Sequence, residues 1–446
     1  MQILLRDVEK EDIASINGYR KSGGYQALEK ALKQLSPAQV LEEIKISGLR
    51  GRGGAGFPTG MKWSFLAKPE GKPRYLVCNG DESEPGTFKD RYLMMHKPHI
   101  LIEGMILSSY ALGAHVSYIY VRGEMMPVIR ILEKAIHEAK NAGLLGKNIL
   151  SSGYDLELYV HPGAGAYICG EETALLESLE GKRGNPRIKP PFPAVEGLYG
   201  CPTVVNNVET ISTVPWVVLN GGAEYSKFGT EKSPGTKLIS ACGNINNPCV
   251  YEIELGLEVE EFLYSDKYCG GIANNKNLKA IIPGGSSVPI LPAALILKNK
   301  TGGKRLMSYE SLAEGGFESG SMLGSGGFIV MDEDNCLVRN TWNLARFYHH
   351  ESCGQCSPCR EGTGWLEKVL AKIESGLGRK EDIDLLVDIA KNIEGKTICP
   401  LGDAAAWPVA SAVRHFRDEF QWHIDFPEKA KKHNYGLAKS KVITGN

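Results

Sequence analysis

The chain has 446 residues, of which 42% are apolar, and its 51 basic and 52 acidic side chains leave a formal net charge of −1. This length predicts about three domains with hydrophobic cores, and the charge balance excludes a general attraction to nucleic acid. No apolar run approaches the roughly twenty residues that cross a bilayer, and the first residues lack the regions of a signal peptide. We therefore expect a cytosolic protein whose eleven cysteines serve metals or cores instead of disulfides.

Residues 1–50 are predicted to be mainly helical. Ser36 is the expected cap of the last helix in this region, and Pro37 lies in its first turn.

A glycine-rich segment, residues 51–63, follows. It contains G-x-G-x-x-G from Gly51, but a dinucleotide-binding fingerprint follows a strand, and here the preceding residues are helical; the G-K-[ST] of a P-loop is also absent. Four glycines within six residues let the backbone approach a flat or phosphorylated ligand, with Lys62 available for an anion. The alternative is a flexible surface loop. Phe57 and Trp63 disfavour this alternative, because aromatic side chains are costly to leave in water.

From residue 75 onwards, predicted strands alternate with predicted helices. The strands are expected at 75–79, 117–121 and 156–160, and the helices at 99–113, 126–141 and 171–179. This βαβαβ pattern predicts a parallel, Rossmann-like sheet that binds its ligand at the carboxyl ends of the strands.

Acidic residues follow two of these strands, in N-G-D-E-S-E at 79–84 and G-E-E at 170–172. Carboxylates there could bind a divalent metal, act as general bases, or accept hydrogen bonds from ribityl or ribose hydroxyls. A metal site would usually add a histidine or a D-x-D arrangement, which these segments do not show, and hydrolysis needs a paired geometry that a sequence cannot show. Hydroxyl recognition agrees best with the glycine loop, while Glu171 and Glu172 also stand in the first turn of a helix and can cap it.

Residues 182–215 are rich in proline and glycine. A rigid loop bearing Lys189 and Phe192 could cover a ligand. The N-terminal turn of a following helix would be a natural seat for a phosphate, and it would be formed by Asn206, Asn207 and Thr210.

Short strand-like runs from residue 236 predict a small α+β domain that ends near Met331. Four helical segments are expected after it: one at 341–350, one through Trp365 and Ile373 closed by Gly376, one through Ile383 and Ile393 closed by Gly395, and one that Asp403 caps. The lysines near the end are expected to form a solvated tail or to dock on a partner, namely Lys429, Lys431, Lys432, Lys439 and Lys441.

The connection between the first two of these helices reads C-G-Q-C-S-P-C and supplies Cys353, Cys356 and Cys359, while Cys399 lies forty residues on. Three closely spaced thiolates and one remote thiolate are typical of a [4Fe–4S] cluster. Zinc usually takes two separated C-x-x-C pairs. Four unrelated core thiols are the remaining alternative, and glycine and proline between the cysteines disfavour it.

The glycine loop, the acidic loop, G-E-E-T-A-L, N-N-V-E-T, C-x-x-C-x-x-C and I-C-P-L-G-D occur here in one order. With these motifs in this order, the chain resembles the flavin-bearing, NADH-oxidising subunit of respiratory complex I. Diaphorase subunits of NAD-linked hydrogenases and formate dehydrogenases share these motifs, but many carry extra terminal domains. The resemblance covers nearly the whole chain and favours the complex I subunit.

The resemblance implies cofactors and ligands at matching positions of this sequence. The cluster ligands would be Cys353, Cys356, Cys359 and Cys399. FMN would be held by Gly51, Arg52, Gly53, Lys62, Asn79, Asp81, Glu82, Gly170, Glu171, Glu172, Val205, Asn206, Asn207, Thr210 and Leu401. NADH would lie over the flavin, near Gly53, Gly54, Ala55, Phe57, Lys62, Phe65, Glu84, Tyr167, Glu172, Lys189 and Phe192.

The resemblance also implies a fold, an activity and partners. We expect a helical segment with the glycine loop (1–60), a Rossmann-like FMN/NADH domain (61–235), a ubiquitin-like module (236–330), and a four-helix bundle with the cluster and a basic tail (331–446). Hydride would pass from NADH to FMN, and single electrons to the cluster, with Glu172 tuning the site and no general base required. The partners would be a thioredoxin-like [2Fe–2S] subunit and a large multi-cluster iron–sulfur subunit, in a peripheral arm on the cytoplasmic side that meets the membrane only indirectly. A diaphorase subunit and a non-catalytic scaffold with a structural cluster are the alternatives.

Overall fold

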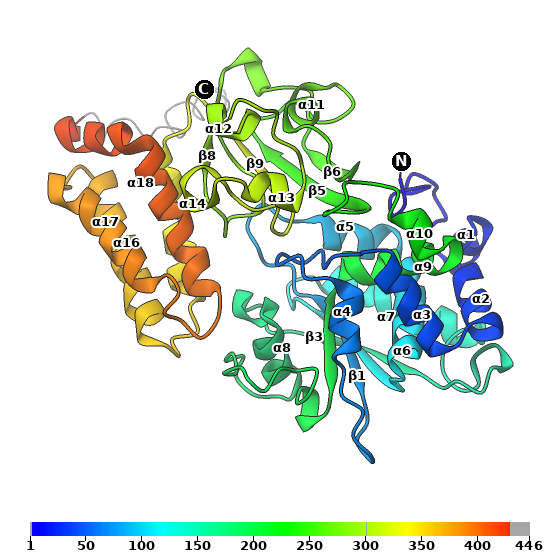
Figure 1. The fold of residues 1–446 in the computed structure, drawn as a ribbon. Coiled ribbons are helices and arrows are strands. Elements are labelled where there is room, and N and C mark those ends of the chain that lie inside the picture. The colour runs from blue at the N-terminus through cyan, green and yellow to red at the C-terminus, as the bar shows by residue number, and fades with distance from the viewer. Residues whose placement is uncertain (1, 300, 429–446) are drawn as a thin grey trace. The chain divides into compact units, whose positions relative to one another are not determined.

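A computed structural model describes residues 2–299 and 301–428, which divide into two compact units (Figure 1). The first unit contains residues 2–83, 87–239 and 250–256, and the second contains 84–86, 240–249 and the described residues from 257 on. The predicted basic tail lies outside the described residues. Within the described ranges, none of the helices combines the length and apolarity that crossing a membrane requires.

The first unit is built on a parallel four-stranded sheet in the order β3-β2-β1-β4. Its strands are β1 (Tyr75–Gly80), β2 (Val116–Val121), β3 (Glu157–Pro162) and β4 (Thr203–Asn207). The first three confirm the predicted strands. β4 was missed, because five residues after a proline give too short a run for the strand pattern to show; it fell inside the segment that we expected to be a loop.

Five helices accompany this sheet: α5 (Lys89–His96), α6 (Pro98–Leu112), α7 (Met126–Asn141), α8 (Glu172–Leu179) and α9 (Val208–Asn220). α6, α7 and α8 coincide with the predicted helices, and α5 was not predicted. α6 is buried on nearly every side, as its apolar sequence indicates. Its one carboxylate, Glu103, is satisfied there by the Tyr19 hydroxyl at 2.6 Å and by the backbone N–H groups of Tyr25 and Leu28.

Short helices precede and follow the glycine loop: α1 (Ile16–Lys21), α2 (Gln26–Gln34), α3 (Pro37–Ile46), α4 (Thr59–Ser64) and α10 (Gly222–Tyr225). Ser36 caps α3 as predicted, in a capping box with Gln39, and Pro37 occupies the first turn.

A second, mixed sheet has the order β6-β5-β9-β7-β8. Its strands are β5 (Thr236–Gly243), β6 (Cys249–Glu254), β7 (Leu278–Ile282), β8 (Leu291–Pro292) and β9 (Gly327–Asp332). β9 is parallel to β5 and antiparallel to β7. The helices of this part are α11 (Val259–Tyr264), α12 (Ala293–Leu297), α13 (Tyr309–Ala313) and α14 (Gly316–Ser319).

Four long helices end the described chain: α15 (Leu337–Glu351), α16 (Ser357–Glu374), α17 (Lys380–Ile393) and α18 (Leu401–Asp425). They confirm the predicted bundle, and Gly376 and Gly395 close α16 and α17 with φ values of 73° and 68°, which glycine adopts without strain. Short connections make successive helices antiparallel, so residues 352–356 and 394–400 lie at the same end of the bundle (Figure 1).

Candidate functional site

The glycine loop is an ordered hairpin. The N–H of Gly51 donates to the carbonyl of Phe57 at 2.8 Å, and the N–H of Thr59 donates to the carbonyl of Leu49 at 2.8 Å. A Cβ on Gly53 would lie 3.1 Å from the Cβ of Asn207, so the loop is seated against the end of β4. A Cβ on Gly54 would meet nothing within 4 Å, which leaves the tip of the loop, with Ala55, open to an approaching group.

Arg52 connects this loop to buried residues of the first unit. Its backbone N–H donates to the Thr210 hydroxyl at 2.8 Å, and its buried guanidinium donates to the Tyr225 hydroxyl at 3.1 Å and to the Pro234 carbonyl at 2.9 Å. Two of the predicted FMN residues, Arg52 and Thr210, therefore contact each other. They tie the glycine loop to the first turn of α9.

The predicted polar residues converge where the strand order changes direction, between β1 and β4. Asn79 is the last residue but one of β1 and donates to the carbonyl of Gly170 at 2.8 Å, while its side-chain oxygen accepts from the N–H of Asp81. Asn207 ends β4 and caps α9 by accepting from the N–H of Glu209. In parallel sheets this switch point is where crossovers diverge and ligands bind, and the N-terminus of α9 offers its partial positive charge there.

Two further predicted FMN residues lie on strand β4. Val205 lies in the middle of β4, at the edge of the sheet, and pairs with Val77 of β1. Asn206 lies in the strand itself, not in a helical turn as predicted, and accepts a hydrogen bond from the Trp63 indole at 2.7 Å. Trp63 is thus buried, as its cost in water led us to expect, whereas the same expectation was wrong for Phe57, which is exposed.

The first residue of α8 is a glutamate that lies between two lysines. We call Glu172, Lys62 and Lys189 the ligand-side cluster. The Lys62 ammonium lies 2.8 Å and the Lys189 ammonium 2.9 Å from the Glu172 carboxylate, and Lys189 also reaches Glu171 at 3.0 Å. Burial would raise the pKa of Glu172, but the two lysines outweigh it and lower that pKa to about 2. Glu172 is therefore ionised at neutral pH.

Glu171 has the capping role that the sequence predicted for this turn. Its carboxylate accepts from the N–H groups of Thr173 and Ala174 at the start of α8. Tyr167 begins the 3₁₀ turn Tyr167–Gly170 immediately before it.

Three phenylalanine side chains within five residues of Lys62 or Lys189 in the sequence are largely exposed. Phe57, Phe65 and Phe192 are 45%, 57% and 57% exposed, and the rings of Phe57 and Phe65 lie 6.3 Å apart. Aromatic rings left in solvent around a charged site favour a flat apolar partner, such as a base or a flavin ring.

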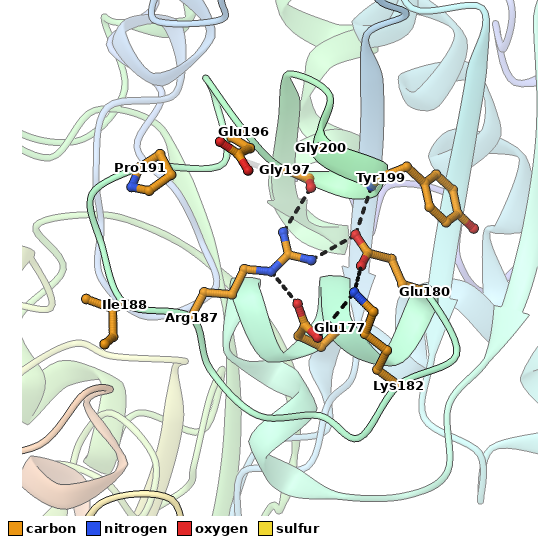
Figure 2. Close-up of a pocket in the computed structure, with 10 residues that line it drawn as sticks. All are labelled: Glu177, Glu180, Lys182, Arg187, Ile188, Pro191, Glu196, Gly197, Tyr199 and Gly200. Carbon is orange, nitrogen blue, oxygen red and sulfur yellow. Dashed lines mark hydrogen bonds and ion pairs between the residues drawn. The ribbon is translucent and has the colours of Figure 1, made fainter.

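The loop that carries Lys189 and Phe192 is held by a separate ion-pair network (Figure 2). The Arg187 guanidinium bonds to Glu177 at 2.5 Å, to Glu180 at 2.8 Å and to the Gly197 carbonyl at 2.9 Å. A shallow hollow of about 550 Å³ lies over this network, and none of the predicted ligand residues lines it. The network fixes the proline-rich loop to α8 and so presents Lys189 to Glu172.

A second glutamate between two lysines is fully buried, and sequence reasoning missed it. We call Glu209, Lys89 and Lys237 the buried cluster. The Glu209 carboxylate lies 2.7 Å from the Lys89 ammonium and 3.4 Å from that of Lys237, and it accepts from the N–H of Leu238. Burial opposes ionisation of Glu209, but Lys237 and Lys89 lower its pKa. Glu209 stood inside the N-N-V-E-T motif and Lys89 inside the acidic segment, yet nothing in the spacing indicated burial.

The pKa values of the two lysines of the buried cluster are shifted in opposite net directions. Burial lowers the pKa of Lys89, but Asp90 at 2.8 Å and Glu209 outweigh it, so that pKa is raised. Burial lowers the pKa of Lys237 to about 7, which Glu209 only partly counters. Asp90 in turn accepts from the Asn207 amide at 2.6 Å, which connects the buried cluster to the end of β4.

Two predicted ligand residues have structural partners. Glu82 accepts from the N–H groups of Asp90 and Arg91, both at 2.8 Å, and so caps α5. Burial and the neighbouring Asp90 raise the pKa of Glu82 to about 7. In the second unit, Glu84 accepts from the Ser287 N–H at 2.7 Å and from the Ser286 hydroxyl at 3.1 Å.

The cysteine residues predicted to hold iron lie at one end of the bundle. Cys353, Cys356 and Cys359 span the connection from α15 to α16, and Cys399 precedes α18, whose first residue is Leu401. Cys356 occupies the N-cap position of α16, and Cys359 is buried in its first turn. Burial raises the pKa of Cys359 to about 11, with Cys356 and Cys353 adding to it. Four sulfurs near a helix N-terminus fit a cluster whose iron replaces the thiol protons.

Comparison with known proteins gives matches along the chain. Residues 44–216 match the Nuo51 FMN-binding domain, residues 237–323 the SLBB domain, and residues 339–423 the NADH-ubiquinone oxidoreductase-F iron-sulfur binding region. One of the NADH-quinone oxidoreductase F subunits of Rhizobium meliloti, numbered 2, is 49% identical, covering 95% of this chain and 97% of that protein. The NADH-quinone oxidoreductase F subunit of Mycobacterium tuberculosis is 51% identical, covering 94% and 92%. A solved NAD+-reducing [NiFe]-hydrogenase in the H2-reduced state aligns with a TM-score of 0.81 and 32% identity, covering 100% of this chain and 71% of its own.

Proposed function

Since the chain belongs to the family of NADH-quinone oxidoreductase F subunits, we propose that the residues around the glycine loop hold its flavin and NADH, and that the cysteine loop holds its cluster. The chain is the NADH-oxidising, electron-input flavoprotein subunit of a complex I-type enzyme, with FMN and a [4Fe–4S] cluster as cofactors. When bound, FMN accepts hydride from NADH and passes single electrons to the cluster.

The convergence at the β1–β4 switch point is the observation that carries the FMN site. The open space at Gly54 leaves room for a flat ring system at the tip of the loop, and the first turn of α9 offers its N-terminus to a phosphate. Asn79 is held by Gly170 and can offer its remaining hydrogen-bonding capacity to hydroxyls. Arg52 and Glu82 support this site through the loop and α5 that they anchor.

The ligand-side cluster and the exposed phenylalanines form the proposed NADH side. Phe57, Phe65 and Phe192 would cover the nucleotide, and Lys62 and Lys189 would meet its phosphates or hydroxyls. Glu172, held ionised, orients both lysines and places a negative charge beside the reacting rings. Hydride transfer requires stacking at a set distance and no general base. The role of Glu172 is therefore to position the two lysines and to tune the electrostatics of the site.

Cys353, Cys356, Cys359 and Cys399 would bind the four irons of the cluster. We further propose the domain division at residues 60, 235 and 330, and a place in a peripheral arm on the cytoplasmic side. There the chain would meet a thioredoxin-like [2Fe–2S] subunit and a large multi-cluster subunit.

An absorption spectrum of the anaerobically purified protein, before and after NADH, tests this function. We expect a yellow flavin band that NADH bleaches, above a broad iron–sulfur background. A colourless protein after reconstitution, or one that carries zinc at all four cysteines, would contradict the proposal.

Two variants separate the cofactor sites. Cys399→Ala should abolish the cluster signal in EPR while FMN still binds, because the four sulfurs and the glycine loop belong to different units. Glu172→Gln should alter nucleotide handling or flavin potential while the EPR signal persists. Loss of both cofactors in either variant would show that the two sites depend on each other.

A diaphorase subunit of an NAD-linked hydrogenase is the second candidate, because a solved NAD+-reducing hydrogenase shares the fold over the whole chain. Co-purification decides between the two. Hydrogenase subunits would support the diaphorase, and further iron–sulfur and membrane subunits would support complex I.

A further inference from the structure

Three potential metal ligands meet inside the helical bundle, away from the cysteine loop. Cys336 is the N-cap of α15, Glu374 is the last residue of α16, and His423 lies in the last turn of α18. They are 1%, 7% and 0% exposed. The Cys336 sulfur lies 3.2 Å from the His423 Nε2, and the His423 Nδ1 lies 3.7 Å from a Glu374 carboxylate oxygen.

This cluster leaves polar atoms unsatisfied. Neither the His423 Nδ1 nor the Glu374 Oε2 has a hydrogen-bond partner among the described residues, although both atoms are buried. The surrounding charged groups are engaged elsewhere: Arg339 reaches the other Glu374 oxygen at 3.3 Å, and Glu419 pairs with Lys279 and accepts from the N–H of Leu337. Buried polar atoms without partners are costly, so their persistence points to a missing partner.

We propose that Cys336, Glu374 and His423 bind a zinc ion. One donor atom from each residue lies within 4.8 Å of the other two. Zn²⁺ binds Cys sulfur at about 2.3 Å and His nitrogen or carboxylate oxygen at about 2.0–2.2 Å. Cys336 faces the Nε2 and Glu374 the Nδ1 of His423, so binding requires the His423 ring to turn until one nitrogen meets the ion together with the other two donors. Mixed sulfur, nitrogen and oxygen ligands suit Zn²⁺ better than Mg²⁺ or Ca²⁺, which prefer oxygen. Water, or the second oxygen of Glu374, completes a tetrahedral shell.

The site joins three helix ends at one end of the bundle. α15 begins there, and α16 and α18 end there, whereas the cysteine loop connects the opposite ends of α15 and α16. α16 has 18 residues, so at 1.5 Å per residue about 27 Å separates its ends. The ion would therefore tie the bundle at the end remote from the iron–sulfur cluster and would not share its ligands.

A nucleophilic role does not suit this arrangement. Cys336 sits beside a histidine, as in cysteine hydrolases, but its 1% exposure leaves no path for a substrate. A structural metal site requires no such path.

Metal analysis of the full chain, purified with FMN and cluster and without chelators, tests the proposal. We expect about one zinc per chain in the wild type. Cys336→Ser and His423→Gln should each lower zinc at least tenfold, with iron and FMN unchanged. Cys269→Ser is the matched control, because it removes another buried cysteine and should keep its zinc.

The zinc X-ray absorption spectrum of the wild type decides the matter even if the variants do not fold. One sulfur with nitrogen and oxygen neighbours would support the site. Four sulfurs would mean that zinc had replaced iron at the cysteine loop, and the proposal would be wrong. It would be equally wrong if zinc stayed below about a tenth of an ion per chain after incubation with zinc sulfate, or if His423→Gln kept full zinc.

Discussion

The first unit contains the same arrangement twice, a glutamate held between two lysines, in two different surroundings. In the ligand-side cluster, the side chains of Glu172, Lys62 and Lys189 are 24–30% exposed. In the buried cluster, those of Glu209, Lys89 and Lys237 are at most 1% exposed. The first can exchange its ion pairs for contacts with a ligand. The second cannot be reached by one.

Because the two clusters differ in burial, the same three residue types have different roles in each. Water screens the ligand-side cluster, so its ion pairs add little stability, and in the proposed function its role is to present charge to a nucleotide. The buried cluster has lost that screening, so each charge depends on its partners, and removing one leaves the others uncompensated. The buried cluster supports the seat of α9 and the glycine loop, since Lys237 also donates to the carbonyl of Arg52 at 3.2 Å.

Of the variants in the two clusters, Glu209→Gln should lower the unfolding free energy most. It removes the one carboxylate that both buried lysines share, and breaking a buried ion pair costs about 3–5 kcal/mol. The measurement is urea denaturation of the protein at pH 7, with Glu172→Gln as the matched control. Equal losses of unfolding free energy in both variants would show that burial does not separate the two clusters.

The two buried lysines should then differ from each other. Lys89→Met removes a lysine whose pKa is raised by Asp90 and Glu209, and it should cost on the order of 3 kcal/mol. Lys237→Met removes a lysine whose pKa is lowered to about 7, and the methionine keeps most of its apolar stem, so we expect a loss of about 1 kcal/mol. A larger loss for Lys237→Met would reverse this assignment.

These two clusters also mark what the sequence could and could not reveal. Glu172 was predicted because it adjoins a predicted strand end in a compact motif, and the four cysteines were predicted because their spacing is itself the signal. Glu209, Lys89 and Lys237 come from three distant segments, and only the folded sheet makes them neighbours. β4 was missed for a related reason: its five residues carry too little pattern, and its place beside β1 is set by tertiary pairing.

The lowered pKa of Lys237 predicts a specific dependence of stability on pH. In the folded chain that pKa is about 7, against an ordinary value of 10.5, so between these pH values the unfolded chain binds more protons. Unfolding free energy should therefore rise with pH from about 7 towards 10.5, by at most about 1.4 kcal/mol per pH unit. Urea denaturation at pH 7, 8 and 9 should show this rise in the wild type and a flatter profile in Lys237→Met. Identical profiles would mean that Lys237 stays charged.

Glu172→Gln should have the smallest effect on stability and a selective effect on function. At neutral pH we expect it to lower the unfolding free energy by less than Glu209→Gln does, because its ion pairs are partly solvated. The Glu172 pKa is lowered from 4.5 to about 2, so its stabilisation is present above pH 4.5 and is lost as the pH falls towards 2; the variant should lose less stability over that interval. Without the carboxylate, Lys62 and Lys189 repel each other and the proline-rich loop loses one tie, so KM for NADH should rise about tenfold, equivalent to about 1.4 kcal/mol. Arg187→Lys, which keeps the charge but weakens the anchor of the same loop, should raise KM less. If KM were unchanged in Glu172→Gln while stability fell by several kcal/mol, the ligand-side cluster would be structural too, and exposure would not distinguish the two.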